Sequence, residues 1–172
     1  IAKLFSIIAF IFITLSLIII KITPASSGYE LSIYSAYPWF LWVFLIGAII
    51  IGILIIFKEI LSETKSNIWI VGLFSILLSN LIILLLPYFR GYAISGGASA
   101  DIFTHYGWIS EIANTGQIFE NNFYPIIHTF TVLLSESIGL DINQILWFIP
   151  PLSSVLYVLF IYLFSKVISK NH

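Results

Sequence analysis

Four long runs of apolar residues, separated by short polar or charged segments, dominate the pattern of the chain. The runs cover residues 4–20, 39–57, 68–86 and 145–164. A helix needs about 20 mostly apolar residues to cross the roughly 30 Å of hydrocarbon in a bilayer. The pattern therefore predicts an all-α fold, a polytopic transmembrane helical bundle of about four spans.

Composition agrees with this interpretation and narrows the function classes. Hydrophobic residues make up 60% of the 172 residues and charged residues 9%, and the mean hydropathy is +1.08. These values lie far outside the averages of soluble domains. The net charge of −1 and the absence of any Lys or Arg run provide no basic surface for nucleic acid. We expect an integral membrane protein with no nucleic-acid partner. Since the sequence starts at Ile1 and contains no methionine, we also expect a fragment of a longer chain.

The charges predict how the chain is organised across the membrane. Three spans occupy residues 1–86, a long polar segment covers 87–144, and residues 145–172 hold the fourth span and its end. Lys and Arg in short loops are retained on the cytoplasmic side. That rule places five lysines inside and Lys21 and Arg90 outside; the five are Lys3, Lys58, Lys65, Lys166 and Lys170. We expect a multi-pass protein of the cell membrane, with a cytoplasmic N-terminus and residues 87–144 extracytoplasmic. Residues 126–140 are too short for a span and predict an interfacial or re-entrant helix.

The segment 87–144 concentrates the polar chemistry of the chain. Residues 101–113 fit an amphipathic helix that stops at the Asn-Thr-Gly of 114–116. The predicted apolar side holds Ile102, Phe103, Tyr106, Ile109 and Ala113. The opposite side, expected to face the protein, holds Asp101, Thr104, His105, Trp108 and Glu111, with Ile112 as an exception. Asp101 and His105 are neighbours on this surface because they are four residues apart.

Ordinary structural roles also fit these residues. Asp101 can cap the helix, His105 and Trp108 can anchor it at the interface, and Pro125 can start a second helix, with Tyr124 at the headgroup level. A metal site is a further alternative. One carboxylate and one imidazole are too few ligands, so Glu111, Glu120 and His128 would have to converge on them.

The order of the motifs resembles the first outer loop of the C-type (GT-C) superfamily of multi-spanning, polyprenyl-phosphate-sugar-dependent glycosyltransferases. The motifs are Asp101, His105, Gly107, "NTGQIF", an Asn-rich turn, "YP", His128 and "LLSESIGL". The similarity covers roughly residues 95–165 and is nearest to prokaryotic, particularly archaeal, members. It implies an enzyme with amphipathic interfacial helices in its outer loop, which transfers a sugar from a polyprenyl-phosphate-linked donor to an acceptor on the outer face of the membrane.

The resemblance also implies roles for single residues. Asp101 matches the acidic residue of the family loop and would act as general base or as ligand to a divalent metal such as Mg²⁺ or Mn²⁺. His105 would orient Asp101 or touch the donor phosphate, and Glu111, Tyr124 and His128 would contact substrate. Arg90 is placed either to pair with lipid phosphate or to anchor the interface. The "SGGAS" of 95–99 is either an anion cradle or a plain loop.

Two departures from the family pattern keep a second hypothesis open. No acidic residue adjoins Asp101, and four spans are fewer than family members have. The alternatives are therefore the N-terminal portion of a transferase, completed by the remainder of the same chain, and a noncatalytic membrane subunit. Such a subunit would pack its spans against larger membrane-protein partners and lipid.

Overall fold

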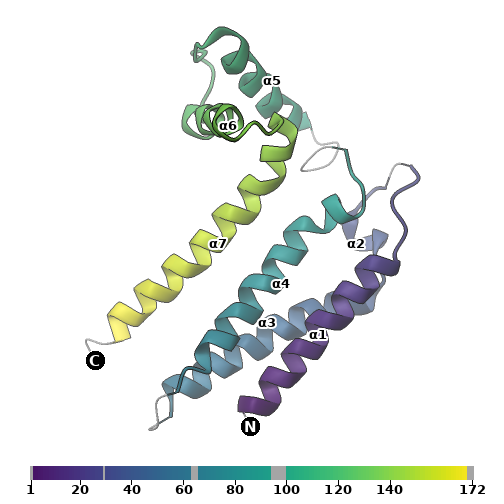
Figure 1. Cartoon of the computed structure of the whole chain (residues 1–172), viewed down its shortest axis with the longest axis vertical. Coiled ribbons are helices and arrows are strands. Elements are labelled where there is room, and N and C mark those ends of the chain that lie inside the picture. Colours follow the sequence, from purple (N-terminus) through teal and green to yellow (C-terminus); the bar gives the residue numbers. More distant parts are fainter. Residues whose placement is uncertain (1, 29, 63–65, 94–99, 170–172) are drawn as a thin grey trace.

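The computed structural model describes residues 2–28, 30–62, 66–93 and 100–169, and every regular element in these residues is a helix (Figure 1). Four of the described helices are long and apolar enough to cross a membrane. They are α1 (Ala2–Ile22), α3 (Trp39–Ile60), α4 (Trp69–Phe89) and α7 (Ile142–Ser169). The prediction of an all-α, multi-pass membrane protein is confirmed, and each predicted run coincides with one of these helices.

All four helices are longer than the predicted apolar runs, and the extensions of α4 and α7 have local causes. Helix α4 continues through Pro87, where the prediction ended it, because a proline in the last turn removes only one backbone hydrogen bond. The chain then turns at Gly91, whose φ is +84°, and the Tyr92 amide donates to the Pro87 carbonyl at 3.0 Å. Helix α7 begins at Ile142 because Asp141 accepts the Asn143 amide at 2.8 Å, as a residue before a helix often does.

Helices α1, α3 and α4 form a three-helix bundle with α3 packed on both partners. Its core contains Leu41, Leu45, Ala48 and Leu86, which are fully buried. Gly52 of α3 and Gly72 of α4 face each other so closely that a Cβ atom on either would lie 2.6 Å from the carbonyl oxygen of the other. Small residues allow helix backbones to approach in this way inside membranes.

Helix α7 lies against α4 (Figure 1). Asn80 donates to Ser154 across this contact at 2.6 Å. The rings of Trp69 and Tyr162 stack with centroids 5.1 Å apart. The interface therefore combines a polar side-chain bond with aromatic packing.

The two ends of the molecule differ in chemistry. The start of α1, the end of α3, the start of α4 and the end of α7 lie at one end, and α5 (Ala100–Thr115) and α6 (Pro125–Ile138) lie at the other (Figure 1). Lys3, Lys58 and Lys166 belong to the first, which we call the lysine end. The opposite end is called the hairpin end. The predicted sidedness also used Lys65 and Lys170, which lie outside the described residues.

Helices α5 (Ala100–Thr115) and α6 (Pro125–Ile138) pack against each other, and α6 packs on α7. The core of this hairpin contains Ile109, Ile112, Val132 and Leu146. Helix α6 has only 14 residues, so it agrees with the predicted short helix and is not one of the membrane-crossing helices. Pro125 occupies its first position, as predicted.

Candidate functional site

Asp101 and His105 lie side by side on α5. Oδ2 of Asp101 is 3.5 Å from Nε2 of His105. The carboxylate side chain is 86% exposed and the imidazole 26%. Asp101 lies in the first turn of the helix, which begins at Ala100, and not before it as a capping residue would. The pair therefore presents an accessible carboxylate beside a partly covered imidazole.

His105 continues into a chain of polar side chains from α6 and the preceding turn. Its Nδ1 lies 2.8 Å from Nε2 of His128, and Nδ1 of His128 lies 2.7 Å from Oδ1 of Asn122. His128 and Asn122 are buried. Burial lowers the pKa of His128, and the neighbouring His105 lowers it further. His128 is therefore held as a neutral ring near pH 7.

Asn122 is fixed by the backbone as well as by His128. The Tyr124 amide donates to its Oδ1 at 3.1 Å, a local turn that Asn favours because its side chain bonds its own backbone two residues on. The Nδ2 group of Asn122 is buried without a hydrogen-bond partner among the described residues.

Aromatic rings flank the two histidines. Trp108 lies 5.8 Å from His105 and 5.3 Å from His128, measured between ring centroids. Tyr124 lies 5.9 Å from His105 and is itself largely exposed. One cluster at the hairpin end therefore contains the pair of Asp101 and His105 and the side chains linked to it. We call this cluster the dyad site; its residues are Asp101, His105, Asn122, Tyr124 and His128.

The buried face of α5 differs from the predicted one. Ile109 and Ile112 are both buried against the hairpin core, and His105 and Trp108 are partly buried beside them. The prediction placed Ile109 on the lipid side and treated Ile112 as an exception. Aliphatic burial, which is worth about 1.5–3 kcal/mol per side chain, decides the inward face, and the polar residues occupy its edge.

Glu111 is not part of the dyad site. It is exposed on α5 and follows Asp101 by ten residues, which is about 15 Å along a helix axis. The predicted substrate contact at Glu111 would therefore lie well away from the Asp101 carboxylate.

Arg90 belongs to a second cluster. Its Nε lies 3.0 Å from both carboxylate oxygens of Glu30, its Nη2 pairs with Oε1 of the same residue, and its Nη1 donates to the Pro24 carbonyl. Tyr92 donates to Glu30 at 2.8 Å. The hydrogen bond from Arg90 lowers the pKa of Glu30, and burial together with Glu30 raises the pKa of Tyr92 to about 12. Arg90 therefore ties the α1–α3 connection to the end of α4.

The residues of the dyad site do not fit a Mg²⁺ or Mn²⁺ ion. Such ions prefer several oxygen ligands, and no group of three or more His, Cys, Asp or Glu side chains converges among the described residues. Asp101 offers a single carboxylate. The nitrogens through which His105 and His128 face each other, 2.8 Å apart, are occupied by that contact.

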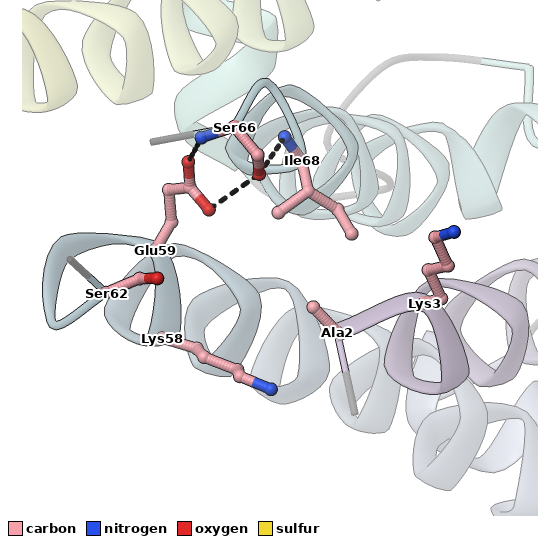
Figure 2. A pocket seen from close by; sticks show the side chains of 7 residues that line it. All are labelled: Ala2, Lys3, Lys58, Glu59, Ser62, Ser66 and Ile68. Atoms are coloured by element: carbon pink, nitrogen blue, oxygen red, sulfur yellow. Dashed lines mark hydrogen bonds between the residues drawn. The ribbon is translucent and has the colours of Figure 1, made fainter. Parts of the chain in front are cut away.

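A separate open cavity of about 350 Å³ lies at the lysine end (Figure 2). Glu59 turns toward Ser66, whose hydroxyl donates to it at 2.8 Å, while Lys3 and Lys58 point elsewhere (Figure 2). This cavity contains no residue of the dyad site.

Sequence reasoning missed Asn122 and the pairing of Arg90 with Glu30. The signal that could have found Asn122 is its place in the turn, two residues before Tyr124 and six before His128. The predicted anion cradle at 95–99 lies outside the described residues. Comparison of the chain with family models, curated proteins and solved structures returns no match.

Proposed function

We propose that the protein is a membrane glycosyltransferase of the GT-C type, or its N-terminal portion, with the dyad site facing the outside of the cell membrane. The donor is a polyprenyl-phosphate-linked sugar and the acceptor carries a hydroxyl or amide nucleophile. One observation carries this proposal: an exposed carboxylate beside two linked histidines, on a hairpin at the end of a helix that can cross the membrane.

The chemistry of transfer suits this arrangement. The acceptor atom forms a bond to C1 of the sugar, while the bond from C1 to the phosphate oxygen breaks and its electron pair leaves with the polyprenyl phosphate. The proton of the acceptor goes to the pair of Asp101 and His105. Positioned general bases contribute about 10²–10⁴-fold to such steps.

The proposed orientation in the membrane is based on the distribution of lysine residues between the two ends of the molecule. Lys3, Lys58 and Lys166 are all at the lysine end, the end that the distribution of positive charge assigns to the cytoplasm. The hairpin end then meets the outer leaflet, where lipid-linked sugars of this class are used.

Transfer of label from polyprenyl-phosphate sugars tests the proposal. Membranes that contain the natural full-length chain are incubated with a panel of polyprenyl-phosphate monosaccharides carrying a radiolabelled sugar, and label leaving the lipid fraction is counted. We expect Asp101→Asn to lower transfer by about 10²-fold or more. The control Glu136→Gln removes an exposed carboxylate of α6 and should transfer as the unmodified protein does.

The same variants separate the enzyme from a noncatalytic subunit. Assembly is measured by size-exclusion chromatography in mild detergent and by co-purification of partner subunits. Loss of transfer with intact assembly supports the enzyme. Equal transfer by Asp101→Asn and the unmodified protein, or a loss of assembly alone, refutes the proposed function.

A further inference from the structure

The chain of contacts from Asn122 to His105 determines which ring nitrogens carry protons. Oδ1 of Asn122 accepts the Tyr124 amide, and because a backbone amide can only donate, this atom is the amide oxygen. Nδ1 of His128, 2.7 Å from the same oxygen, must then donate as well. A neutral imidazole has one N–H group, so Nε2 of His128 carries a lone pair.

The lone pair on Nε2 of His128 in turn determines which nitrogen of His105 carries a proton. Nε2 of His128 faces Nδ1 of His105 at 2.8 Å, so Nδ1 of His105 supplies the proton of that bond. In the neutral ring, Nε2 of His105 is left with its lone pair. This nitrogen is the one that lies 3.5 Å from Oδ2 of Asp101.

We infer that Asn122 and His128 are positioning residues, which hold His105 as its Nδ1–H tautomer and so place the Nε2 lone pair beside the exposed carboxylate of Asp101. Two adjacent hydrogen-bond acceptors attract an O–H or N–H donor and repel a phosphate. The chemical class that can donate to this pair is therefore the hydroxyl or amide group of an acceptor substrate.

The catalytic meaning of this inference rests on the proposed function. The acceptor hydroxyl gives its proton to Nε2 of His105 as its oxygen bonds to C1 of the sugar, and the resulting imidazolium is paired with the Asp101 carboxylate. His105 thus serves the acceptor and not the donor phosphate, a choice that the sequence left open.

The energetics of Asn122 support a role beyond packing. A buried polar group without a partner destabilises the fold, and Nδ2 of Asn122 is such a group among the described residues. An aliphatic side chain of similar volume would avoid this cost. The benefit of the asparagine therefore lies in its oxygen, which accepts the Tyr124 amide and orients His128.

Nitrogen NMR of the chain in lipid nanodiscs tests the inference directly. Histidine is labelled with ¹⁵N, the spectra are recorded near pH 8, and the three histidines of the sequence are assigned by single substitutions. We expect His105 and His128 both to be protonated at Nδ1, whereas free imidazole side chains favour Nε2–H. A wild-type spectrum with His105 protonated at Nε2 overturns the inference without any variant.

Two variants break the chain of contacts at different links. Asn122→Leu removes the acceptor of His128, and His128→Phe removes the acceptor of His105, so in each we expect His105 to change to Nε2–H. Thr129→Val is the control, because the Thr129 hydroxyl has no partner in the described structure and takes no part in the contacts from Asn122 to His105. This substitution should leave the tautomers of His105 and His128 unchanged. An unchanged His105 in both chain-breaking variants refutes the inference.

Transfer measured for the same variants, introduced into the natural full-length chain, separates this inference from the proposed function. We expect Asn122→Leu to lower kcat by about 10²-fold with little change in KM, because a misplaced proton acts on the transition state. If both histidines carry their protons at Nδ1 but no sugar transfer is detected, the inference stands and the proposed function is refuted. Transfer that needs Asp101 but proceeds with His105 protonated at Nε2 would do the opposite.

Discussion

The contact between Gly52 and Gly72 predicts a measurable cost for a single methyl group. Alanine at position 72 would place its Cβ 2.6 Å from the Gly52 carbonyl oxygen and 3.0 Å from Cγ1 of Ile56. The nearest obstacle is backbone, which cannot rotate away. To move from 2.6 Å to the 3.4 Å at which ordinary contact begins, α3 and α4 must separate by about 0.8 Å.

The magnitude follows from the loss of packing. A gap of about 0.5–1 Å forfeits a quarter to a half of the dispersion energy of the atoms that face each other, and overpacking of this kind costs about 1–3 kcal/mol. Alanine recovers about 0.8–1.0 kcal/mol through its helix propensity. We therefore expect a net loss of about 1 kcal/mol, the middle of the overpacking range less this gain, in the free energy of unfolding for Gly52→Ala or Gly72→Ala.

The double variant provides a sharper test. Once the helices have separated for one methyl group, the second finds room, so the cost of the pair should be clearly less than the sum of the two single costs. Unfolding is followed by tryptophan fluorescence during titration with SDS in mixed micelles. Gly47→Ala is the matched control, because its new Cβ would meet only the ring of Phe12 at 2.7 Å, and that ring can turn.

Two results would refute the reasoning about this helix pair. One is a Gly72→Ala variant as stable as the unmodified protein. The other is a Gly47→Ala variant that loses more stability than Gly72→Ala, which would place the tightest helix contact between α1 and α3.

Three further predictions concern polar groups outside the glycine contact. Arg90→Gln should lower the free energy of unfolding by about 1–3 kcal/mol, because it leaves the Glu30 carboxylate without its charged partner; thermal unfolding at pH 7 measures the loss. Because the pKa of Glu30 is lowered on folding from 4.5, the stability it contributes is present above pH 4.5 and is lost as the pH falls below that value, so the difference between the two proteins should shrink toward pH 3. Asn80→Leu should weaken the α4–α7 contact by about 0.6–1.7 kcal/mol through the bond to Ser154, and an unchanged SDS midpoint would contradict it. His128 has a pKa lowered from 6.5, so the unfolded chain binds the proton first and the hairpin should lose stability as the pH falls below 6.5, which hydrogen exchange of α6 amides between pH 7.5 and 5.5 will show.

The sequence was sufficient for the long helices and insufficient for their contacts, and it did not predict the short helix α2 (Ile33–Ala36). The long apolar runs predict the four spans because length and hydrophobicity alone decide whether a helix can cross a bilayer. The contact of His105 with His128 joins residues 23 positions apart and depends on how α5 crosses α6. Periodicity cannot provide that angle.

The buried partners were harder still to predict. Glu30 and Arg90 are 60 residues apart, and nothing local marks one as the partner of the other. Asn122 looked like an ordinary turn residue, since its oxygen serves the Tyr124 amide. The same atom also faces a histidine, a second use that only the folded hairpin reveals.

The length of α7 makes bilayer thickness a variable of the dyad site. Its 28 residues extend about 42 Å, against about 32 Å for the 21 residues of α1, while the hydrocarbon is roughly 30 Å thick. Helix α7 must therefore tilt or project beyond the lipid by several ångströms, and its first turns carry the hairpin through Leu146. Hydrophobic mismatch then sets the height of Asp101 above the hydrocarbon. A thicker membrane brings the carboxylate down toward the headgroup phosphates, and a thinner one raises it into water.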